Sequence, residues 1–266
     1  MTVCALVSAG GAPGVTTAAL ALAMTWPGPV LVAETDPSGG DVLAGFFAGH
    51  VPGDRGLLHV AYEATTVEAA AAAVAAQLVA LDEAGSRKVL PGLADPRHAA
   101  TLNVTWHLLA AALAAQHIDV LADCGRLDGG PGQEHVLRVA TEIVLVLRPT
   151  LRQAAAARSR IEMLAQLSDS LADNHVTLLV TGQGPVGPNE IARALGVPLL
   201  GTLPDDRRAA QVLSDGAGAR RGIDSSPLLR AAAVAARALT RTGRPVPGTP
   251  AGADGGATLA AGTGRA

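Results

Sequence analysis

The feature that most constrains this chain is a glycine-rich loop that lies between an apolar strand and a helix, close to the start of the sequence. The uncharged run Thr2–Ser8 predicts a short buried strand, and the loop Ala9–Gly14 follows it directly. Val15–Thr25 then predicts a helix, which ends before Pro27. Val30–Glu34 is a second apolar strand. A strand–loop–helix–strand unit of about 35 residues has the length of a βαβ crossover, so we expect a parallel sheet.

The rest of the chain continues this alternation of apolar strands and helices. Further helices are expected at 67–83, 96–116, 136–141, 151–171, 189–195, 206–215 and 227–240, and further strands at 88–90, 119–122, 143–147, 176–181 and 199–201. Such alternation is typical of a mostly parallel, twisted sheet covered on both faces, so the expected fold is a three-layer α/β/α domain over residues 1–242. Residues 243–266 are mostly Gly, Pro, Thr and Ala, and we expect them to form a disordered tail.

Composition narrows the class of protein. A chain of 266 residues with 49% hydrophobic residues can bury one large core, and its net charge of −3 gives no general attraction to nucleic acid. It has no uninterrupted apolar run of about 18 residues, so we expect no transmembrane helix. Cys4 and Cys124 lie in separate apolar segments, and no signal peptide is recognisable. These features predict a cytoplasmic protein.

The glycine-rich loop has the context that phosphate binding requires. Glycines let backbone amides curl around a phosphate, and the N-terminus of the following helix adds a positive field. Thr16 stands where a phosphate loop places the hydroxyl that coordinates Mg²⁺. The alternative is a tight glycine-rich turn that binds nothing.

At this loop the chain resembles a known family. Gly10–Thr17, followed by an alanine-rich helix, is similar to the deviant Walker A loop of the MinD/ParA P-loop ATPases. The family has lysines where this chain has Gly10 and Val15, and Pro13 removes one amide donor from the loop. A lysine–phosphate hydrogen bond contributes roughly 1.5–3 kcal/mol, so the resemblance implies a P-loop NTPase fold whose site is impaired.

Two acidic strand ends extend the resemblance. Glu34 and Asp36 stand where the family has Asp-x-Asp-Pro, which implies a catalytic carboxylate near the attacking water. The segment Asp36–Gly39 is equally compatible with a plain turn. Asp123 ends a strand that resembles Walker B, so it would hold Mg²⁺ together with Thr16.

The base site is matched less closely. The asparagine that reads adenine in the family is missing, and Gln183 is the nearest amide. Residues 196–206, which include Pro204, resemble the family's stretch near the base, and the resemblance runs from about residue 2 to 240. The phosphate and base contacts that it implies come from Gly10, Gly11, Gly14, Val15, Thr16, Thr17, Gln183 and Pro204.

The resemblance implies a nucleotide-binding protein that takes ATP with Mg²⁺ and hydrolyses it weakly or not at all. It would act in positioning or chromosome partitioning, or as a regulatory switch, as a homodimer with an unidentified protein partner. We expect no nucleic acid and no membrane as partner, because the C-terminal arginines are sparse and their helix is otherwise mostly alanine.

Two other hypotheses remain open. In the first, the chain is a pseudo-ATPase that serves as a protein-interaction module without binding nucleotide. In the second, an arginine supplies the missing cation. Arg126, Arg148 and Arg207 each lie at or just past the end of an expected strand, whereas Lys88, the only lysine, lies at the start of one. These arginines could also be merely solvated or ion-paired.

Overall fold

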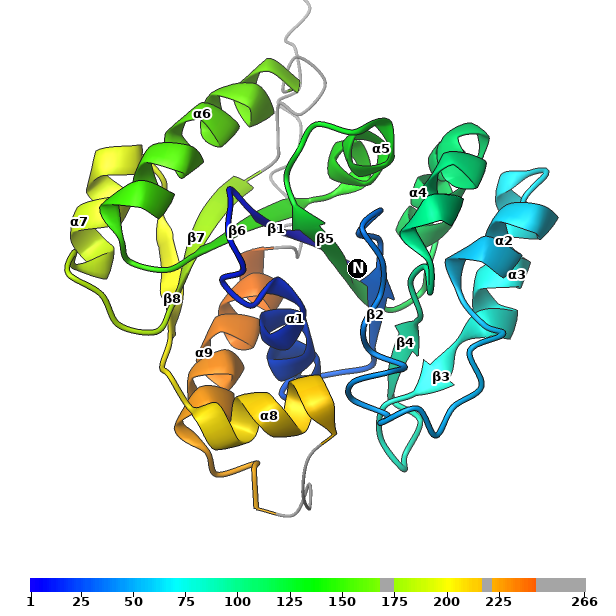
Figure 1. Cartoon of the computed structure of the whole chain (residues 1–266), viewed down its shortest axis with the longest axis horizontal. Helices are drawn as coiled ribbons and strands as arrows, with labels where there is room; N and C mark the ends of the chain where they lie inside the picture. Colours follow the sequence, from blue (N-terminus) through cyan, green and yellow to red (C-terminus); the bar gives the residue numbers. More distant parts are fainter. Residues whose placement is uncertain (168–174, 217–221, 243–266) are drawn as a thin grey trace, which may run out of the picture.

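The structure is a computed structural model that describes residues 1–167, 175–216 and 222–242 (Figure 1). Its strands are β1 (Val3–Ser8), β2 (Val30–Glu34), β3 (Val79–Ala80), β4 (Arg87–Leu90), β5 (Asp119–Arg126), β6 (Glu142–Leu147), β7 (His175–Thr181) and β8 (Leu199–Leu203). Its helices are α1 (Val15–Met24), α2 (Leu57–Glu63), α3 (Val67–Gln77), the 3₁₀-helix η1 (Pro96–Val104), α4 (Trp106–Ala114), α5 (Pro131–Val139), α6 (Leu151–Leu167), α7 (Pro188–Leu195), α8 (Arg207–Asp215) and α9 (Pro227–Thr242).

The eight strands form one sheet in the order β3-β4-β2-β5-β1-β6-β7-β8. All neighbouring strands are parallel except β3 and β4, which pair antiparallel. The strand before the glycine-rich loop, β1, therefore lies near the middle, between β5 and β6. Because parallel strands end at the same edge, the loops after β1, β2 and β5 are brought together there.

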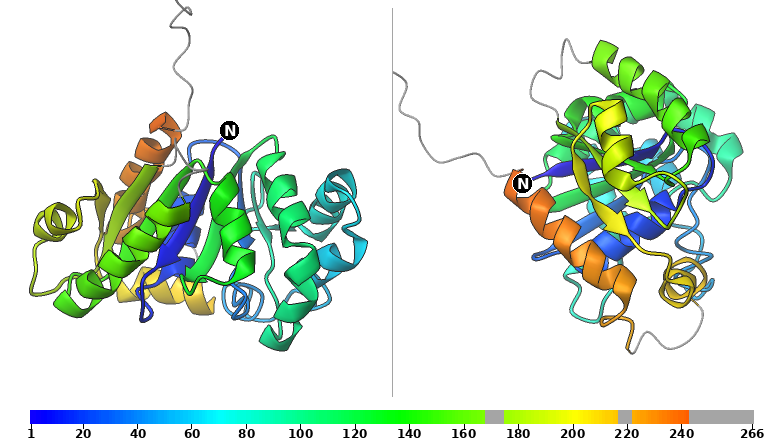
Figure 2. Two further views of the ribbon diagram at one scale, coloured as in Figure 1. Left: turned by 90° about the horizontal axis from the view of Figure 1, so that it is seen from above. Right: turned by 90° about the vertical axis from the view of Figure 1, so that its left-hand side faces the viewer.

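Helices cover both faces of the sheet, so the three-layer α/β/α prediction is confirmed (Figures 1 and 2). Helices α1, α8 and α9 pack on one face, and α2–α7 pack on the other. Strand β1 shows why both faces are apolar: Val3, Ala5 and Val7 join one core, while Cys4 and Leu6 join the other. None of the described helices has the length and apolar character needed to span a bilayer.

The helix expected at 67–83 is too long. Helix α3 ends at Gln77, and the next residues form β3, a short edge strand beside β4. The turn between these strands is closed by Asp82, whose carboxylate accepts hydrogen bonds from the Ser86 hydroxyl at 2.7 Å and from the Arg87 guanidinium at 2.9 Å. Tertiary pairing therefore overrides the helix propensity of this stretch.

Other boundaries differ as well. The helix expected at 96–116 is divided into η1 and α4 at Thr105, whose hydroxyl donates to the Leu102 carbonyl at 3.2 Å. Helix α2 was not expected, helix 136–141 begins earlier as α5, and strand 119–122 continues to Arg126 as β5. The predicted tail 243–266 and the end of the helix predicted at 151–171 lie outside the described residues.

Candidate phosphate-binding site

The glycine-rich loop connects β1 to α1 and leaves the first amides of that helix without intrahelical acceptors. Gly14 precedes the helix with φ of 91°, a left-handed conformation that glycine adopts at little cost. The first intrahelical bond runs from the Ala18 amide to the Gly14 carbonyl at 2.9 Å. The amides of Val15, Thr16 and Thr17 precede it, so they are available to an anion.

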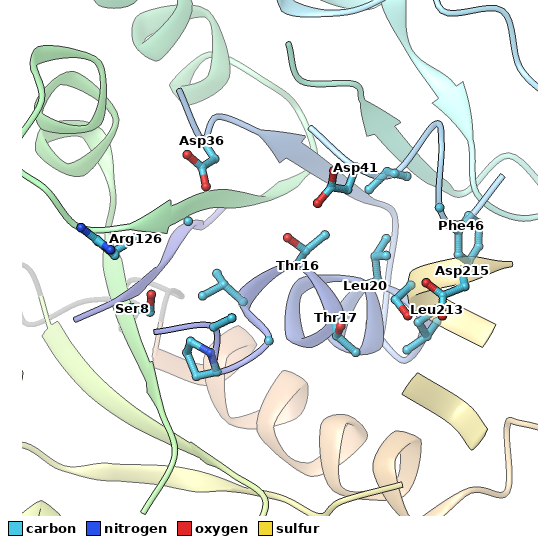
Figure 3. A pocket seen from close by; sticks show the side chains of 18 of the residues that line it. Ser8, Thr16, Thr17, Leu20, Asp36, Asp41, Phe46, Arg126, Leu213 and Asp215 are labelled. Carbon is cyan, nitrogen blue, oxygen red and sulfur yellow. The ribbon is translucent and has the colours of Figure 1, made fainter. Parts of the chain in front are cut away.

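These residues border a cavity of about 600 Å³ at the carboxyl edge of the sheet (Figure 3). Besides the loop, its walls come from the segment after β2, the end of β5 and the end of α8. Polar and charged side chains that line it are Ser8, Thr16, Thr17, Asp36, Asp41, Arg126, Ser214 and Asp215. The cavity thus combines unpaired amides with several carboxylates, a combination suited to phosphate together with a divalent cation.

Asp123 and Thr16 meet at the base of this site. Asp123 is 2% exposed on β5. Its carboxylate accepts a hydrogen bond from the Gly125 amide at 3.0 Å, and the Thr16 hydroxyl lies close enough to favour its charged form. Burial, together with the charges of Asp36 and Asp41, raises the pKa of Asp123 to about 6, although Thr16 and the Gly125 amide favour the charged form. The structure therefore brings together the two residues that the sequence assigned to Mg²⁺.

Asp36 lines the same cavity. Its carboxylate accepts a hydrogen bond from the Ser38 amide at 2.7 Å, so the turn expected at this position is present as well. Partial burial raises the pKa of Asp36, and the nearby charges of Asp128 and Asp41 add to the rise. Neighbouring carboxylates raise each other's pKa because their negative charges repel, and a divalent cation bound between them would relieve this repulsion.

Glu34 has a different place. Its side chain is 3% exposed and does not line the cavity beside the loop. One carboxylate oxygen accepts from the amides of Asp41 at 2.8 Å and Val42 at 3.0 Å, and the other accepts from the Gly92 amide at 3.0 Å. Glu34 thus ties together the segments that follow β2 and β4, and of the two carboxylates expected to be catalytic only Asp36 lines the cavity.

The pKa of Glu34 predicts a pH dependence of stability. Burial raises this pKa from 4.5 to about 7, against the three amide hydrogen bonds. Between these values the folded state binds more protons than the unfolded state, so the free energy of unfolding falls as pH rises. We expect wild type to lose about 1–3 kcal/mol more than Glu34→Gln between pH 5 and 7.5, measured by urea unfolding.

The control for this measurement is Glu134→Gln on α5, where the carboxylate forms a surface ion pair with Arg138. That variant should keep the wild-type dependence on pH, because exposed pairs contribute little. Equal slopes in wild type and Glu34→Gln would contradict the assignment.

The two positions that hold lysines in the resembling family carry no cation here. Val15 is 7% exposed and packs in the core between the sheet and α1, although one side of it lines the cavity. Gly10 does not line the cavity. Lys88 pairs with Leu31 in the amino-terminal half of β4, away from the carboxyl edge.

A second cavity of about 470 Å³ lies on the other side of the loop, and Gly14 and Thr17 line both cavities. Pro204 lines it, whereas the exposed Gln183 does not. An ion pair of 3.4 Å joins Arg148 and Asp205 at its wall. Of the two residues expected near the base, the structure therefore places Pro204, but not Gln183, in a cavity beside the glycine-rich loop.

Several contributing residues were not recognised in the sequence. Asp41 lines the first cavity, and its position after Gly39-Gly40 was the only local signal. Thr181 at the end of β7 donates its hydroxyl to the Pro13 carbonyl at 2.9 Å, which anchors the loop. Gln133 on α5 donates to the Cys124 and Arg126 carbonyls at 2.7 and 2.6 Å. These contacts depend on the tertiary fold, so no local pattern predicts them.

No protein-family model and no curated protein matches the sequence. Solved structures do match the fold. MinD from Pyrococcus horikoshii complexed with Mg-ADP has a TM-score of 0.68 at 17% identity, with 90% of this chain and 95% of that chain covered. A ParA family ATPase from Chlorobium tepidum has a TM-score of 0.67 at 16% identity, with 89% and 97% covered.

A third similar structure is the MinC:MinD cell division protein complex from Aquifex aeolicus, with a TM-score of 0.66, 15% identity and coverage of 92% and 98%. At these identities the likeness concerns the fold. The chain therefore has the fold of the MinD/ParA P-loop ATPases, as its sequence predicted.

Proposed function

We propose that this chain binds ATP with Mg²⁺ at the glycine-rich loop and acts as a nucleotide-dependent switch with weak or no hydrolysis. The observation that carries the proposal is the closeness of the Thr16 hydroxyl to the buried carboxylate of Asp123, beneath a cavity bordered by unpaired helix amides. A hydroxyl at the start of a helix, next to a carboxylate at a strand end, is the arrangement that P-loop proteins use for Mg²⁺.

The residues present fit such an ion when phosphate accompanies it. Among the described residues no three carboxylates, histidines or cysteines form a metal-binding group by themselves. Mg²⁺ usually takes one or two protein ligands together with water and phosphate oxygens. Thr16 and Asp123 would hold the ion, which would neutralise phosphate charge, and Asp36 would orient a water molecule.

Weak hydrolysis follows from the missing lysines. Charge develops on the phosphate oxygens during transfer, and fixed cations stabilise it. Neither Gly10 nor Val15 can supply one, so the Mg²⁺ complex should bind more readily than it reacts. The fold shared with MinD and ParA ATPases supports a role in positioning or partitioning, with a homodimer and a protein partner as part of this proposal.

The alternative is a pseudo-ATPase that serves as a protein-interaction module. The buried Val15 at the lysine position favours it, because this position adds apolar surface rather than charge to the cavity. In that case the cavity beside the loop would be a feature of the fold that binds no nucleotide.

Calorimetry with ATP separates the two. We expect wild type to bind ATP in the presence of Mg²⁺ and to bind it more weakly without the ion. Asp123→Asn should weaken Mg²⁺-dependent binding about tenfold or more, because the second acceptor oxygen and the charge are lost. Glu134→Gln, which alters an exposed carboxylate on α5, should bind as wild type does. Absence of heat at millimolar ATP with Mg²⁺ would favour the pseudo-ATPase.

A further inference from the structure

The cavity beside the loop is rich in carboxylates but contains one basic side chain. Asp36, Asp41 and Asp215 line it, and Arg126 is the only lysine or arginine among its described lining residues. A phosphate that enters this cavity meets negative charge as well as amides. Mg²⁺ relieves part of that repulsion, and a side-chain cation on the phosphates would relieve more.

We propose that Arg126 does the work of the missing phosphate-loop lysine by binding the terminal phosphates of the nucleotide. This inference rests on the proposed function, because it concerns the same site. The proposal selects Arg126 from the three arginines that could have supplied the cation. Arg148 is paired with Asp205, and both Arg148 and Arg207 line the second cavity rather than the first.

The backbone of Arg126 is held beside the loop on two sides. Arg126 is the last residue of β5 and lies in register with Ser8, the last residue before the loop. The Leu127 amide donates to the Ser8 carbonyl at 2.8 Å, and the buried Gln133 amide donates to the Arg126 carbonyl at 2.6 Å. The backbone of Arg126 is therefore held in place by the sheet and by α5.

The side chain of Arg126, in contrast, is free to change its conformation. Arg126 is exposed, and its guanidinium forms no hydrogen bond or ion pair with any of the described residues. In Figure 3 it stands beside Ser8 and points away from Thr16. Binding must therefore turn it toward the loop, which it can do without breaking an existing interaction. A guanidinium can then donate two parallel hydrogen bonds to phosphate oxygens.

The test compares ATP, adenosine and inorganic tripolyphosphate as ligands, each with Mg²⁺. Arg126→Ala should weaken binding of ATP and tripolyphosphate about tenfold or more and leave adenosine unchanged, because only the phosphates lose a contact. Arg126→Lys should recover part of the loss. Arg138→Gln, a surface arginine of α5, should bind all three ligands as wild type does.

The outcomes separate this inference from the proposed function. Wild type that binds ATP, with Arg126→Ala binding equally well, would overturn the role of Arg126 and leave nucleotide binding intact. A larger loss of tripolyphosphate binding in Arg148→Ala or Arg207→Ala than in Arg126→Ala would overturn it too. Wild type that binds neither ATP nor tripolyphosphate would overturn both proposals. Unchanged circular dichroism and melting temperature would show that the variants fold.

Discussion

Replacement of Gly125 by alanine is expected to lower the free energy of unfolding by about 2–3 kcal/mol and to move Asp36 out of its place. Gly125 has φ of 62°, and a left-handed conformation costs a residue with a side chain about 1–2 kcal/mol. A Cβ atom at this position would lie 1.7 Å from Asp36 Oδ2 and 2.2 Å from its Cγ. Asp36 must therefore turn away and lose its hydrogen bond with the Ser38 amide.

Gly85→Ala is the matched control. Gly85 has φ of 64°, nearly the same conformation, but no atom lies within 4 Å of the added Cβ. The Gly85→Ala variant should therefore lose only the free energy that the left-handed backbone conformation costs. Urea unfolding gives the stability of both variants, and calorimetry gives their affinity for ATP with Mg²⁺. Because Asp36 lines the cavity, only Gly125→Ala should also change ligand binding. Equal effects of the two substitutions would show that the contact with Asp36 is unimportant.

Most of the fold could be predicted because its signals are local. Apolar runs such as Val30–Glu34 identify buried strands, and the alternation with helices implies a parallel sheet. The hairpin of β3 and β4 could not be predicted, since β3 has only two residues, Val79 and Ala80, and they continue a stretch with high helix propensity. The break at Thr105 was also missed, because the hydrogen bond from its hydroxyl to the Leu102 carbonyl leaves the apolar pattern of the helix unchanged.

The residues of the candidate site, too, include some that the sequence could predict and some that it could not. Thr16 and Asp123 could be paired from sequence, because strand ends and helix starts of a parallel sheet meet at one edge. The role of Glu34 could not, because its three amide partners come from segments that fold back over the strand ends. Arg126 was one of three arginines that the sequence offered as a substitute for the missing lysine. Only its register with Ser8 places it beside the loop, and only the strand order shows that register.

Val15→Lys is expected to strengthen ATP binding about tenfold to a hundredfold and to raise the rate of hydrolysis by a comparable or larger factor. Val15 packs against the core but also lines the cavity, so a lysine can keep its stem on apolar surface and extend its ammonium to the phosphates. The added charge should matter most in the transition state. A moderate loss of stability, of about 1–2 kcal/mol, should accompany the longer side chain.

The control for this substitution is Val15→Met, which adds a side chain of similar length without charge. It should share the loss of stability but gain neither affinity nor turnover, as measured by calorimetry and phosphate release. Equal behaviour of the two variants would show that packing, not charge, limits the site.

Combining Val15→Lys with Arg126→Ala tests whether the two cations act on the same phosphates. If Arg126 already binds them, the new lysine should improve ATP affinity more in the Arg126→Ala background than in wild type, because the two contacts partly replace each other. The coupling energy of this double-mutant cycle should then exceed about 0.5 kcal/mol. Strict additivity would instead mean that the arginine and the lysine act on separate parts of the ligand, and that the carboxylate-rich cavity has no substitute for the missing lysine.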